Sequence, residues 1–408
     1  MNITKMSGPV YRMGVNIHEE GYLFEGLWPI PDGVSINSYL VQGDKTAVID
    51  LTQETAGLVE SLSRQIEMTG TALEDLDYVI VNHMEPDHSG MLKDFVSKNK
   101  KARFICSEKA VPLLQQFCSV PEDRIDSVKD GDTLDLGQGQ VLTFFMVPNV
   151  HWPETMVTWL DSEKTLFACD AFGSYGKVED EIFDDQLSDE RAAFYEKEAL
   201  RYYANIVASF SMFVDKAIAK LAGLDIKIIA PSHGIVWRKN PAKIIEHYQR
   251  YASYAKGPAE KEVCLVWASM YGNTEKAVSP LIRGLKEEGV EVNLFRVPQD
   301  DLGHILAAAW KSAGLIFAMP TYEYKMFPPM ATVVDDLMIK KVKNKKVLRV
   351  GSFGWVGGAE KDFRTRTEKA GWDIMDSVEF QGCPTEEDLK NVENSARELA
   401  KQIKEFVG

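Results

Sequence analysis

At 408 residues the chain is longer than one typical folded core, so we expect about two to three domains. The apolar share of 45% and the charged share of 26% are ordinary for a soluble globular protein, no stretch approaches the roughly 20 apolar residues of a membrane span, and no secretory signal opens the sequence. The formal charge of −15 argues against nonspecific nucleic-acid binding, and five scattered cysteines without a C-x-x-C pair favour a reducing, cytoplasmic setting.

The first part of the chain mixes predicted strands and helices. The strands are short apolar runs bounded by turn residues, and they fall at 46–50, 78–81, 103–106, 141–147 and 226–230. A hairpin joins 156–160 to 165–169. Helical periodicity covers 55–68, 189–221 and about 240–254.

The pattern changes after residue 255. Residues 256–261 are charged, contain a Gly-Pro pair and have the composition of a linker. Predicted strands and helices then alternate, at 263–268, 275–288, 291–297, 302–311, 314–319, 330–338, 346–352, 360–370 and 386–406. Such alternation predicts a parallel, doubly wound sheet covered by helices on both faces. We therefore expect a mixed α/β domain over 1–255 and a doubly wound domain over 256–408.

Seven potential metal ligands stand directly after predicted strands of the first domain. Four of them lie within the six-residue run 83–88, which follows the strand 78–81, and three are isolated; the set is His83, Glu85, Asp87, His88, His151, Asp170 and His233. A single isolated His or Asp of this kind is more often an ordinary surface or core residue than a metal ligand. That explanation does not account for four such residues within 83–88. Because loops at one end of a sheet are close in space, we expect the seven side chains to converge.

Seven ligands exceed the needs of one tetrahedral ion and suit two metals that share a carboxylate. Asp170, alone at the end of a hairpin, is the expected bridge. Imidazoles and carboxylates without a thiolate suit iron, zinc or manganese, and the three carboxylates favour iron. We interpret Cys169 as a packing residue, and we expect no catalytic residue beyond the metal ligands.

Three loops after strands of the second domain have the composition of a flavin site. The first places hydroxyl residues and a glycine before a helix, where backbone N–H groups and the helix N-terminus bind phosphate. The other two combine small residues with aromatics, which allow close approach to a planar ring and stack on it. The expected residues for flavin mononucleotide (FMN) are Ser269, Met270, Tyr271, Gly272, Asn273, Thr274, Pro320, Thr321, Tyr322, Glu323, Ser352, Phe353, Gly354, Trp355, Gly357 and Gly358.

With both sites considered, the chain resembles the flavodiiron proteins, also called A-type flavoproteins. The resemblance covers essentially the whole chain: an H-x-E-x-D-H run from His83 to His88, then a lone His, a lone Asp and a lone His, then a flavodoxin-like phosphate loop. Glu85, in the second ligand position, favours the diiron family, because zinc hydrolases of the same fold usually carry His there. The resemblance implies an N-terminal metallo-β-lactamase-like αββα sandwich followed by a flavodoxin-like doubly wound parallel sheet.

The resemblance also implies an FMN- and diiron-dependent oxidoreductase that reduces dioxygen to water or nitric oxide to nitrous oxide. By the family pattern, the iron nearer the flavin would be bound by His83, Glu85 and His151. The other iron would be bound by Asp87, His88 and His233. Asp170 would bridge the two irons. Electrons would pass from an external donor, such as a rubredoxin-like protein or a reduced flavin or deazaflavin, to FMN and then to iron. A head-to-tail homodimer, or a dimer of such dimers, would bring the FMN of one subunit to the irons of the other.

Two departures and two alternatives accompany this interpretation. Glu25 stands where many relatives have a His, and Glu323 stands where relatives often have an Asn. The first alternative is a dizinc hydrolase with a flavodoxin-like regulatory domain. The second is an electron-transfer module whose metal domain is only structural. We favour the oxidoreductase, because a flavin has little use beside redox-silent zinc.

Overall fold

The computed structural model describes residues 3–408, apart from the side chain of Ala56, and it divides into two compact units. The first unit contains residues up to Tyr203 together with Met212–Gln249, and the second contains Ala204–Ser211 together with Arg250–Gly408. In this described part of the chain, no helix combines the length and the apolar character that crossing a bilayer requires.

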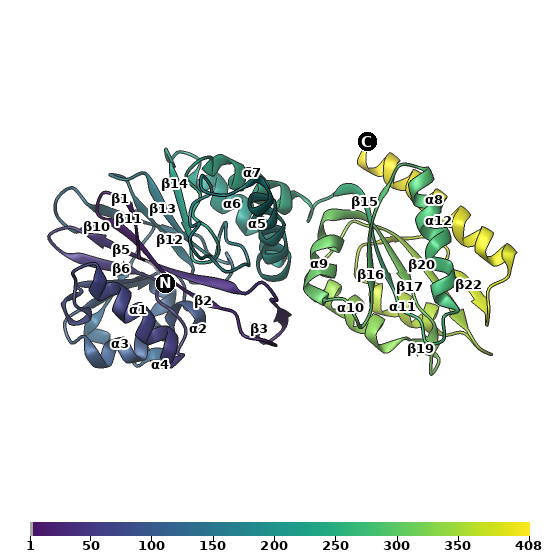
Figure 1. The fold of residues 1–408 in the computed structure, drawn as a ribbon, viewed down its shortest axis with the longest axis horizontal. Helices are drawn as coiled ribbons and strands as arrows, with labels where there is room; N and C mark the ends of the chain where they lie inside the picture. Colours follow the sequence, from purple (N-terminus) through teal and green to yellow (C-terminus); the bar gives the residue numbers. More distant parts are fainter. Residues whose placement is uncertain (1–2) are drawn as a thin grey trace. The chain divides into compact units, whose positions relative to one another are not determined.

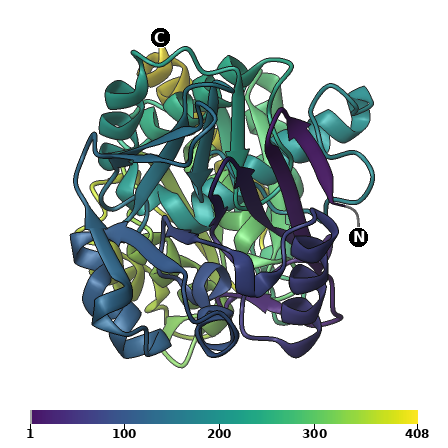
Figure 2. The ribbon, with the colours of Figure 1, turned by 90° about the vertical axis from the view of Figure 1, so that its left-hand side faces the viewer.

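The first unit is built on two sheets (Figures 1 and 2). The larger sheet has the order β1 (Thr4–Ser7), β2 (Val10–Ile17), β5 (Val34–Gln42), β6 (Thr46–Ile49), β7 (Tyr78–Val81), β8 (Arg103–Ser107) and β9 (Ile125–Val128). The smaller sheet has the order β10 (Thr133–Asp135), β11 (Val141–Met146), β12 (Met156–Leu160), β13 (Thr165–Cys169) and β14 (Ile228–Pro231). The sheets face each other: the Tyr39 ring of β5 lies 5.2 Å from the Phe167 ring of β13, and its hydroxyl donates to the Pro231 carbonyl at 2.7 Å.

Helices cover both outer faces of this pair of sheets (Figure 1). The helices α1 (Ala56–Met68), α3 (Leu92–Lys98) and α4 (Val111–Cys118) bury apolar side chains such as Leu62 and Phe95 against the larger sheet. The helices α5 (Asp189–Tyr202), α6 (Ser211–Leu221) and α7 (Pro241–Ser253) lie on the side of the smaller sheet. The result is the αββα sandwich expected for this domain.

The helical pattern predicted over 189–221 is interrupted in the structure. The helix α5 ends at Tyr202, a π-helical turn spans Tyr203–Val207, and a short 3₁₀ turn spans Ala208–Phe210 before α6 begins. The interruption coincides with Ala204–Ser211, the segment that belongs to the second compact unit. Periodicity alone could not reveal this break, because the π-helical turn keeps the chain helical while it changes the direction of the faces.

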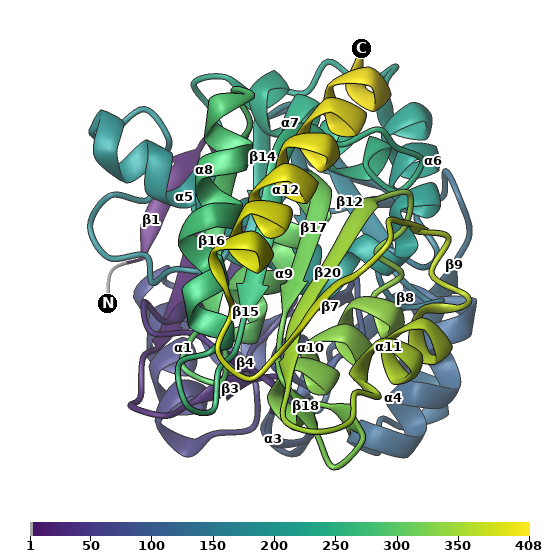
Figure 3. The ribbon, with the colours of Figure 1, turned by 90° about the vertical axis from the view of Figure 1, so that its right-hand side faces the viewer.

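The second unit is a parallel sheet with helices on both faces (Figure 3). Its order is β16 (Glu291–Arg296), β15 (Glu260–Trp267), β17 (Ser312–Ala318), β20 (Lys346–Phe353) and β21 (Asp373–Ile374), and β22 (Val378–Gln381) also pairs with β20. One face packs against α8 (Val278–Glu287) and α12 (Glu386–Val407), and the other against α9 (Leu302–Lys311), α10 (Pro328–Ile339) and α11 (Ala359–Thr367). The first strand therefore lies second in the sheet, which is the flavodoxin-like order with a switch point at the carboxyl end of β15.

Candidate metal centre and flavin site

The ligand-rich run after β7 is held by the one-turn helix α2 (Pro86–Ser89). Pro86 at the first helical position suits a helix start, so the side chains of Asp87 and His88 project from the helix while those of His83 and Glu85 project from the loop before it. The three isolated ligands follow strands of the smaller sheet: His151 after β11, Asp170 after β13 and His233 after β14.

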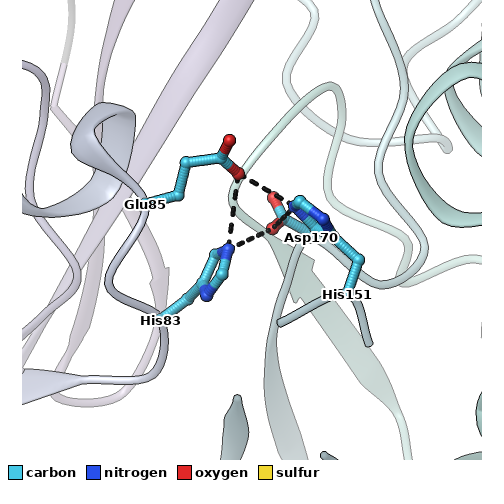
Figure 4. A group of neighbouring side chains, drawn as sticks. All are labelled: His83, Glu85, His151 and Asp170. Atoms are coloured by element: carbon cyan, nitrogen blue, oxygen red, sulfur yellow. Dashed lines mark hydrogen bonds and ion pairs between the residues drawn. The ribbon is translucent and has the colours of Figure 1, made fainter. Parts of the chain in front are cut away.

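The first group of ligands contains His83, Glu85, His151 and Asp170 (Figure 4). Glu85 Oε2 lies 3.4 Å from His83 Nε2 and 2.8 Å from His151 Nε2. Both of these imidazole nitrogens lie 3.5 Å from Asp170 Oδ2. Four ligand atoms from three separate loops therefore point at one small volume.

The second group contains Asp87, His88 and His233. His88 Nε2 lies 3.4 Å from Asp87 Oδ1, and His233 Nε2 lies 3.3 Å from Asp87 Oδ2. The same two nitrogens lie 3.0 Å and 3.3 Å from Asp170 Oδ1. Asp170 therefore presents Oδ2 to the first group and Oδ1 to the second, as a carboxylate that bridges two metal ions would.

The charges in this cluster are strongly coupled. Burial alone would raise the pKa of Asp170, but the imidazoles of His88, His233 and His83 hold that pKa well below its usual range. Burial also opposes ionisation of Glu85, yet hydrogen bonds from His151 and His83 lower its pKa to about 2. Ionised carboxylates beside imidazoles form the donor set that metal ions require.

In the part of the chain that the structure describes, several candidate ligand atoms have no hydrogen-bond partner. Both carboxylate oxygens of Asp87, Oδ2 of Asp170, Nδ1 of His88 and Nε2 of His233 are buried without a hydrogen bond. Buried polar atoms of this kind are costly unless something satisfies them. A pair of metal ions fits these residues, because it would satisfy the carboxylate oxygens and the Nε2 atom at once.

Cys169 lies close enough to His88 and Asp170 to form a third possible group of ligands. Its side chain is buried, and burial raises the pKa of the thiol well above its usual value. A protonated thiol is a poor ligand. This geometry supports our interpretation of Cys169 as a packing residue.

Neighbouring residues that we did not predict support the ligands. His83 Nδ1–H donates to Glu154 Oε1 at 2.7 Å, and His233 Nδ1–H donates to the Ser35 carbonyl at 2.8 Å. The Tyr202 hydroxyl donates to Asp170 Oδ1 at 2.9 Å. Glu154 carries one signal in the sequence, its place three residues after a ligand, whereas no motif marks Ser35 or Tyr202.

The segment around Glu25, the first expected departure from the family pattern, also lies near the candidate ligands. Here Glu25 is exposed and accepts a hydrogen bond from Trp28 Nε1 at 3.0 Å. The residue before it, Phe24, is buried and packs edge-on against the His233 ring at 5.5 Å. An apolar ring therefore contacts the imidazole of that candidate ligand.

The three predicted flavin loops meet at the carboxyl ends of β15, β17 and β20. In the first loop, Gly272 has a φ of +85° and its N–H donates to Ser269 Oγ at 3.0 Å. Thr274, fully buried at the start of the following helical turn, shares a hydrogen bond of 2.9 Å with the hydroxyl of Ser352 in the third loop. Gly358, at a φ of +146°, lies so close to the second loop that a Cβ would stand 2.3 Å from the Tyr324 carbonyl oxygen.

These loops surround a cavity of about 330 Å³. Its lining includes the predicted residues Ser269, Met270, Tyr271, Asn273, Pro320, Thr321, Tyr322, Glu323, Ser352, Phe353, Gly354 and Trp355. Tyr324, Val356 and Gly382, which we did not predict, also line it, whereas Gly272, Thr274, Gly357 and Gly358 are not among the lining residues. The size and the aromatic walls suit a cofactor with a planar ring.

Comparisons with known proteins give the same two parts. A family model described as ODP family beta lactamase matches residues 34–234, and the flavodoxin family model matches residues 265–405. The anaerobic nitric oxide reductase flavorubredoxin of Escherichia coli (strain K12) is 32% identical over 376 residues, which cover 91% of this chain and 76% of that protein.

Solved structures are similar over the whole chain. Rubredoxin oxygen:oxidoreductase from Desulfovibrio gigas has a TM-score of 0.92 and 26% identity, over 100% of both chains. The flavodiiron protein from Giardia intestinalis has a TM-score of 0.93 and 27% identity, over 100% of this chain and 98% of that chain.

Fold and site together define a flavoprotein oxidoreductase with a metallo-β-lactamase-like domain, which carries a His/Asp metal site, and a flavodoxin domain. The chain belongs to the flavodiiron protein family, whose activity is the reduction of dioxygen or nitric oxide. The family resemblance, the fold class and the oxidoreductase function predicted from the sequence are confirmed.

Proposed function

We propose that this flavodiiron oxidoreductase holds two iron ions in the buried cluster of its first domain. The observation that carries the proposal is the position of Asp170, whose two oxygens face two separate groups of ligands at 3.0–3.5 Å. The iron nearer the flavin would be bound by His83, Glu85 and His151. The other iron would be bound by Asp87, His88 and His233, and Asp170 would bridge the two. The proposed domains are 1–255 for iron and 256–408 for FMN.

The three loops of the second domain are the proposed FMN site. The hydroxyls and N–H groups of 269–274 would hold the phosphate, as helix N-termini of this kind do. The aromatic and small residues of 320–323 and 352–358 would hold the ring. Glu323, the second expected departure from the family pattern, lines the cavity, so its carboxylate would lie near the flavin.

The chain's own residues prepare the metal site for gas reduction. Bound iron and FMN supply the sites at which electrons are stored and passed to the gas. Phe24 and Trp152 pack edge-on against His233 and His83, at 5.5 Å and 5.0 Å, and keep water from those ligands. Burial, and then the charge of Asp170, raise the pKa of Tyr202 well above its usual value, so this hydroxyl stays protonated and keeps donating to the bridging carboxylate.

Apolar side chains are exposed at both sites, which supports a head-to-tail dimer. At the flavin loops, Tyr271 is 89% and Trp355 is 78% exposed. Near the metal ligands, Leu23 and Leu27 of the hairpin β3 (Leu23–Phe24) and β4 (Trp28–Pro29) are also exposed. Exposed apolar groups of this kind mark interaction surfaces. In the proposed dimer, or dimer of dimers, the FMN site of one subunit would lie beside the iron site of the other, and an external rubredoxin-like protein, flavin or deazaflavin would supply the electrons.

The test is anaerobic stopped-flow of the reduced, iron- and FMN-loaded chain against each gas, with metal content measured on the same sample. We expect fast reoxidation of FMN by dioxygen, nitric oxide or both, at a rate that follows the iron content. A protein that purifies with zinc, hydrolyses esters or lactams and leaves both gases untouched would instead be the dizinc hydrolase.

A further inference from the structure

One buried carboxylate beside the metal cluster has no role in the function proposed above. Glu154 lies in the loop between His151 and the strand β12, and only 3% of its surface is exposed. Its Oε1 accepts from His83 Nδ1–H at 2.7 Å and from the Met84 backbone N–H at 3.1 Å. The carboxylate therefore fixes the tautomer of His83 and directs its Nε2 at the first group of ligands.

The surrounding loop is built to hold Glu154 in this place. Ser107 Oγ donates to the backbone carbonyl of Glu154 at 2.6 Å. The Met156 N–H donates to the Asn82 carbonyl at 2.9 Å, which ties the start of β12 to the residue before His83. The Trp152 ring stands edge-on to the His83 ring, at 5.0 Å and 86°. Hydrogen bonds to its backbone thus hold the loop that carries Glu154, and the Trp152 ring packs against the His83 imidazole.

The two imidazoles of the second group, those of His88 and His233, have weaker support. His233 Nδ1–H donates to a neutral backbone carbonyl, that of Ser35. Among the residues that the structure describes, His88 Nδ1 has no hydrogen-bond partner. An anionic partner makes an imidazole a more basic ligand than a neutral partner does. At Nδ1, His83 in the first group of ligands therefore has an anionic hydrogen-bond partner, whereas His88 and His233 in the second group have none there within the described chain.

We infer that Glu154 is a positioning residue for His83, and that its charge makes the metal position of His83, Glu85 and His151 the more basic of the two. The inference rests on the proposed diiron site. It predicts that this position binds its ferrous ion more tightly and favours the oxidised ion more than the other position does.

Three variants test the inference. Glu154→Ala removes the contact, whereas Glu154→Gln keeps an acceptor for His83 and Met84 but removes the charge. Asp50→Asn is the matched control, because Asp50 is also a buried carboxylate and accepts from the Asn82 backbone N–H at 2.8 Å, yet no hydrogen bond joins it to a ligand ring.

Each FMN-containing chain, stripped of metal, is titrated with ferrous ion anaerobically against a competing chelator, and the midpoint potential of the reloaded diiron site is followed by electron paramagnetic resonance. We expect Glu154→Ala to weaken the tighter of two binding steps by about 10- to 100-fold. Glu154→Gln should weaken that step less and raise the midpoint potential, while Asp50→Asn should change both quantities less than Glu154→Gln does.

Two outcomes would overturn the inference. One is a Glu154→Gln protein with the affinity and the potential of the wild type, since the charge would then have no effect. The other is an equal change in Glu154→Gln and Asp50→Asn, which would show only a general effect of buried charge. Should Glu154→Ala fail to fold, the isosteric Gln variant still decides the question. A wild-type chain that binds no iron would instead overturn the proposed function, so the two failures are distinguishable.

Discussion

At the scale of single residues, the carboxylate of Asp170 lies within 3.5 Å of the imidazole nitrogens of His83, His151, His88 and His233. We expect Asp170→Asn to reduce bound iron to about half of the wild-type content or less, because a neutral amide cannot bridge two cations as a carboxylate does. The FMN content should not change. Metal analysis and flavin absorbance on one sample measure both quantities.

Asp161→Asn is the control for that variant. Asp161 is exposed in the turn between β12 and β13, on the strand pair that also leads to Asp170. This change should leave the iron content at the wild-type level. Full iron content in Asp170→Asn would contradict the bridging role.

Sequence reasoning selected all seven residues that the structure brings together, and the reason is local. Each of them directly follows a strand, or lies one short loop beyond it, and strand ends of facing sheets meet at one edge. Supporting contacts have no such signature. Tyr202 lies at the end of a long helix, and only the folded chain places its hydroxyl on Asp170.

At the scale of elements, Lys345 lies just before the strand β20 and its side chain is buried. Its Nζ donates to the carbonyls of Trp310 and Ser312 at 2.8 Å and 2.7 Å, which joins the end of α9 to the start of β17. Burial lowers the pKa of this ammonium from 10.5 to about 7. The fold therefore accepts a lysine that is costly to keep charged.

This shift predicts how stability depends on pH. Below about pH 7 the folded and unfolded chains both hold the proton, and the cost of burying the charge is present in full. Between about pH 7 and pH 10 only the unfolded chain holds it, so the free energy of unfolding rises with pH. Lys345→Met should remove this contribution, on the order of a few kcal/mol, and make the pH profile flatter.

Urea denaturation of the wild type and Lys345→Met at a series of pH values measures the difference. Lys346→Met is the control, because Lys346 pairs with Asp373 and keeps part of its side chain in solvent. Its profile should run parallel to that of the wild type. Parallel profiles for Lys345→Met and the wild type would show that Lys345 stays charged in the fold.

The helix α12 begins with a capping box. Thr385 Oγ1 accepts from the Asp388 N–H at 3.2 Å, and Asp388 Oδ2 accepts from the Thr385 N–H at 2.8 Å. Thr385→Ala should lower the free energy of unfolding by about 1 kcal/mol, because it leaves that first-turn N–H without its acceptor. Thr385→Ser keeps the hydroxyl and should stay near the wild type. Urea midpoints would contradict the prediction if both variants matched the wild type.

Elements with regular periodicity were predicted closely, and those without it were not. The hairpin 156–160 and 165–169 and the helix 302–311 have the bounds of β12, β13 and α9. The long strand β5 was not predicted, because its buried residues include Ser35, Asn37 and Ser38 and show no alternation. Their partners, such as the Pro231 carbonyl for the Asn37 amide, come from β14 far along the chain.

At the scale of the whole molecule, the sequence predicts two domains and one cofactor site in each, and in the proposed dimer the route between the sites would depend on the assembly. Two patches of exposed apolar side chains lie near the proposed sites, one at the flavin loops and one at the β3–β4 hairpin. The proposed head-to-tail dimer would cover both patches at once, and it would pair each flavin with the other subunit's metals. Symmetric pairing of two unlike patches in this way creates two equivalent composite sites.

Mixed dimers test this route. One subunit carries Asp170→Asn, which disables its metal site, and the other carries Ser269→Asp, which places a carboxylate where the FMN phosphate would bind. In a head-to-tail dimer the intact flavin of the first subunit faces the intact metals of the second, so one of the two composite sites remains. We expect doubly tagged, purified mixed dimers to reduce the gas with about half of the wild-type activity, while each parent homodimer is inactive. Transfer within one subunit would leave the mixed dimer as inactive as its parents, because neither chain then holds both intact sites.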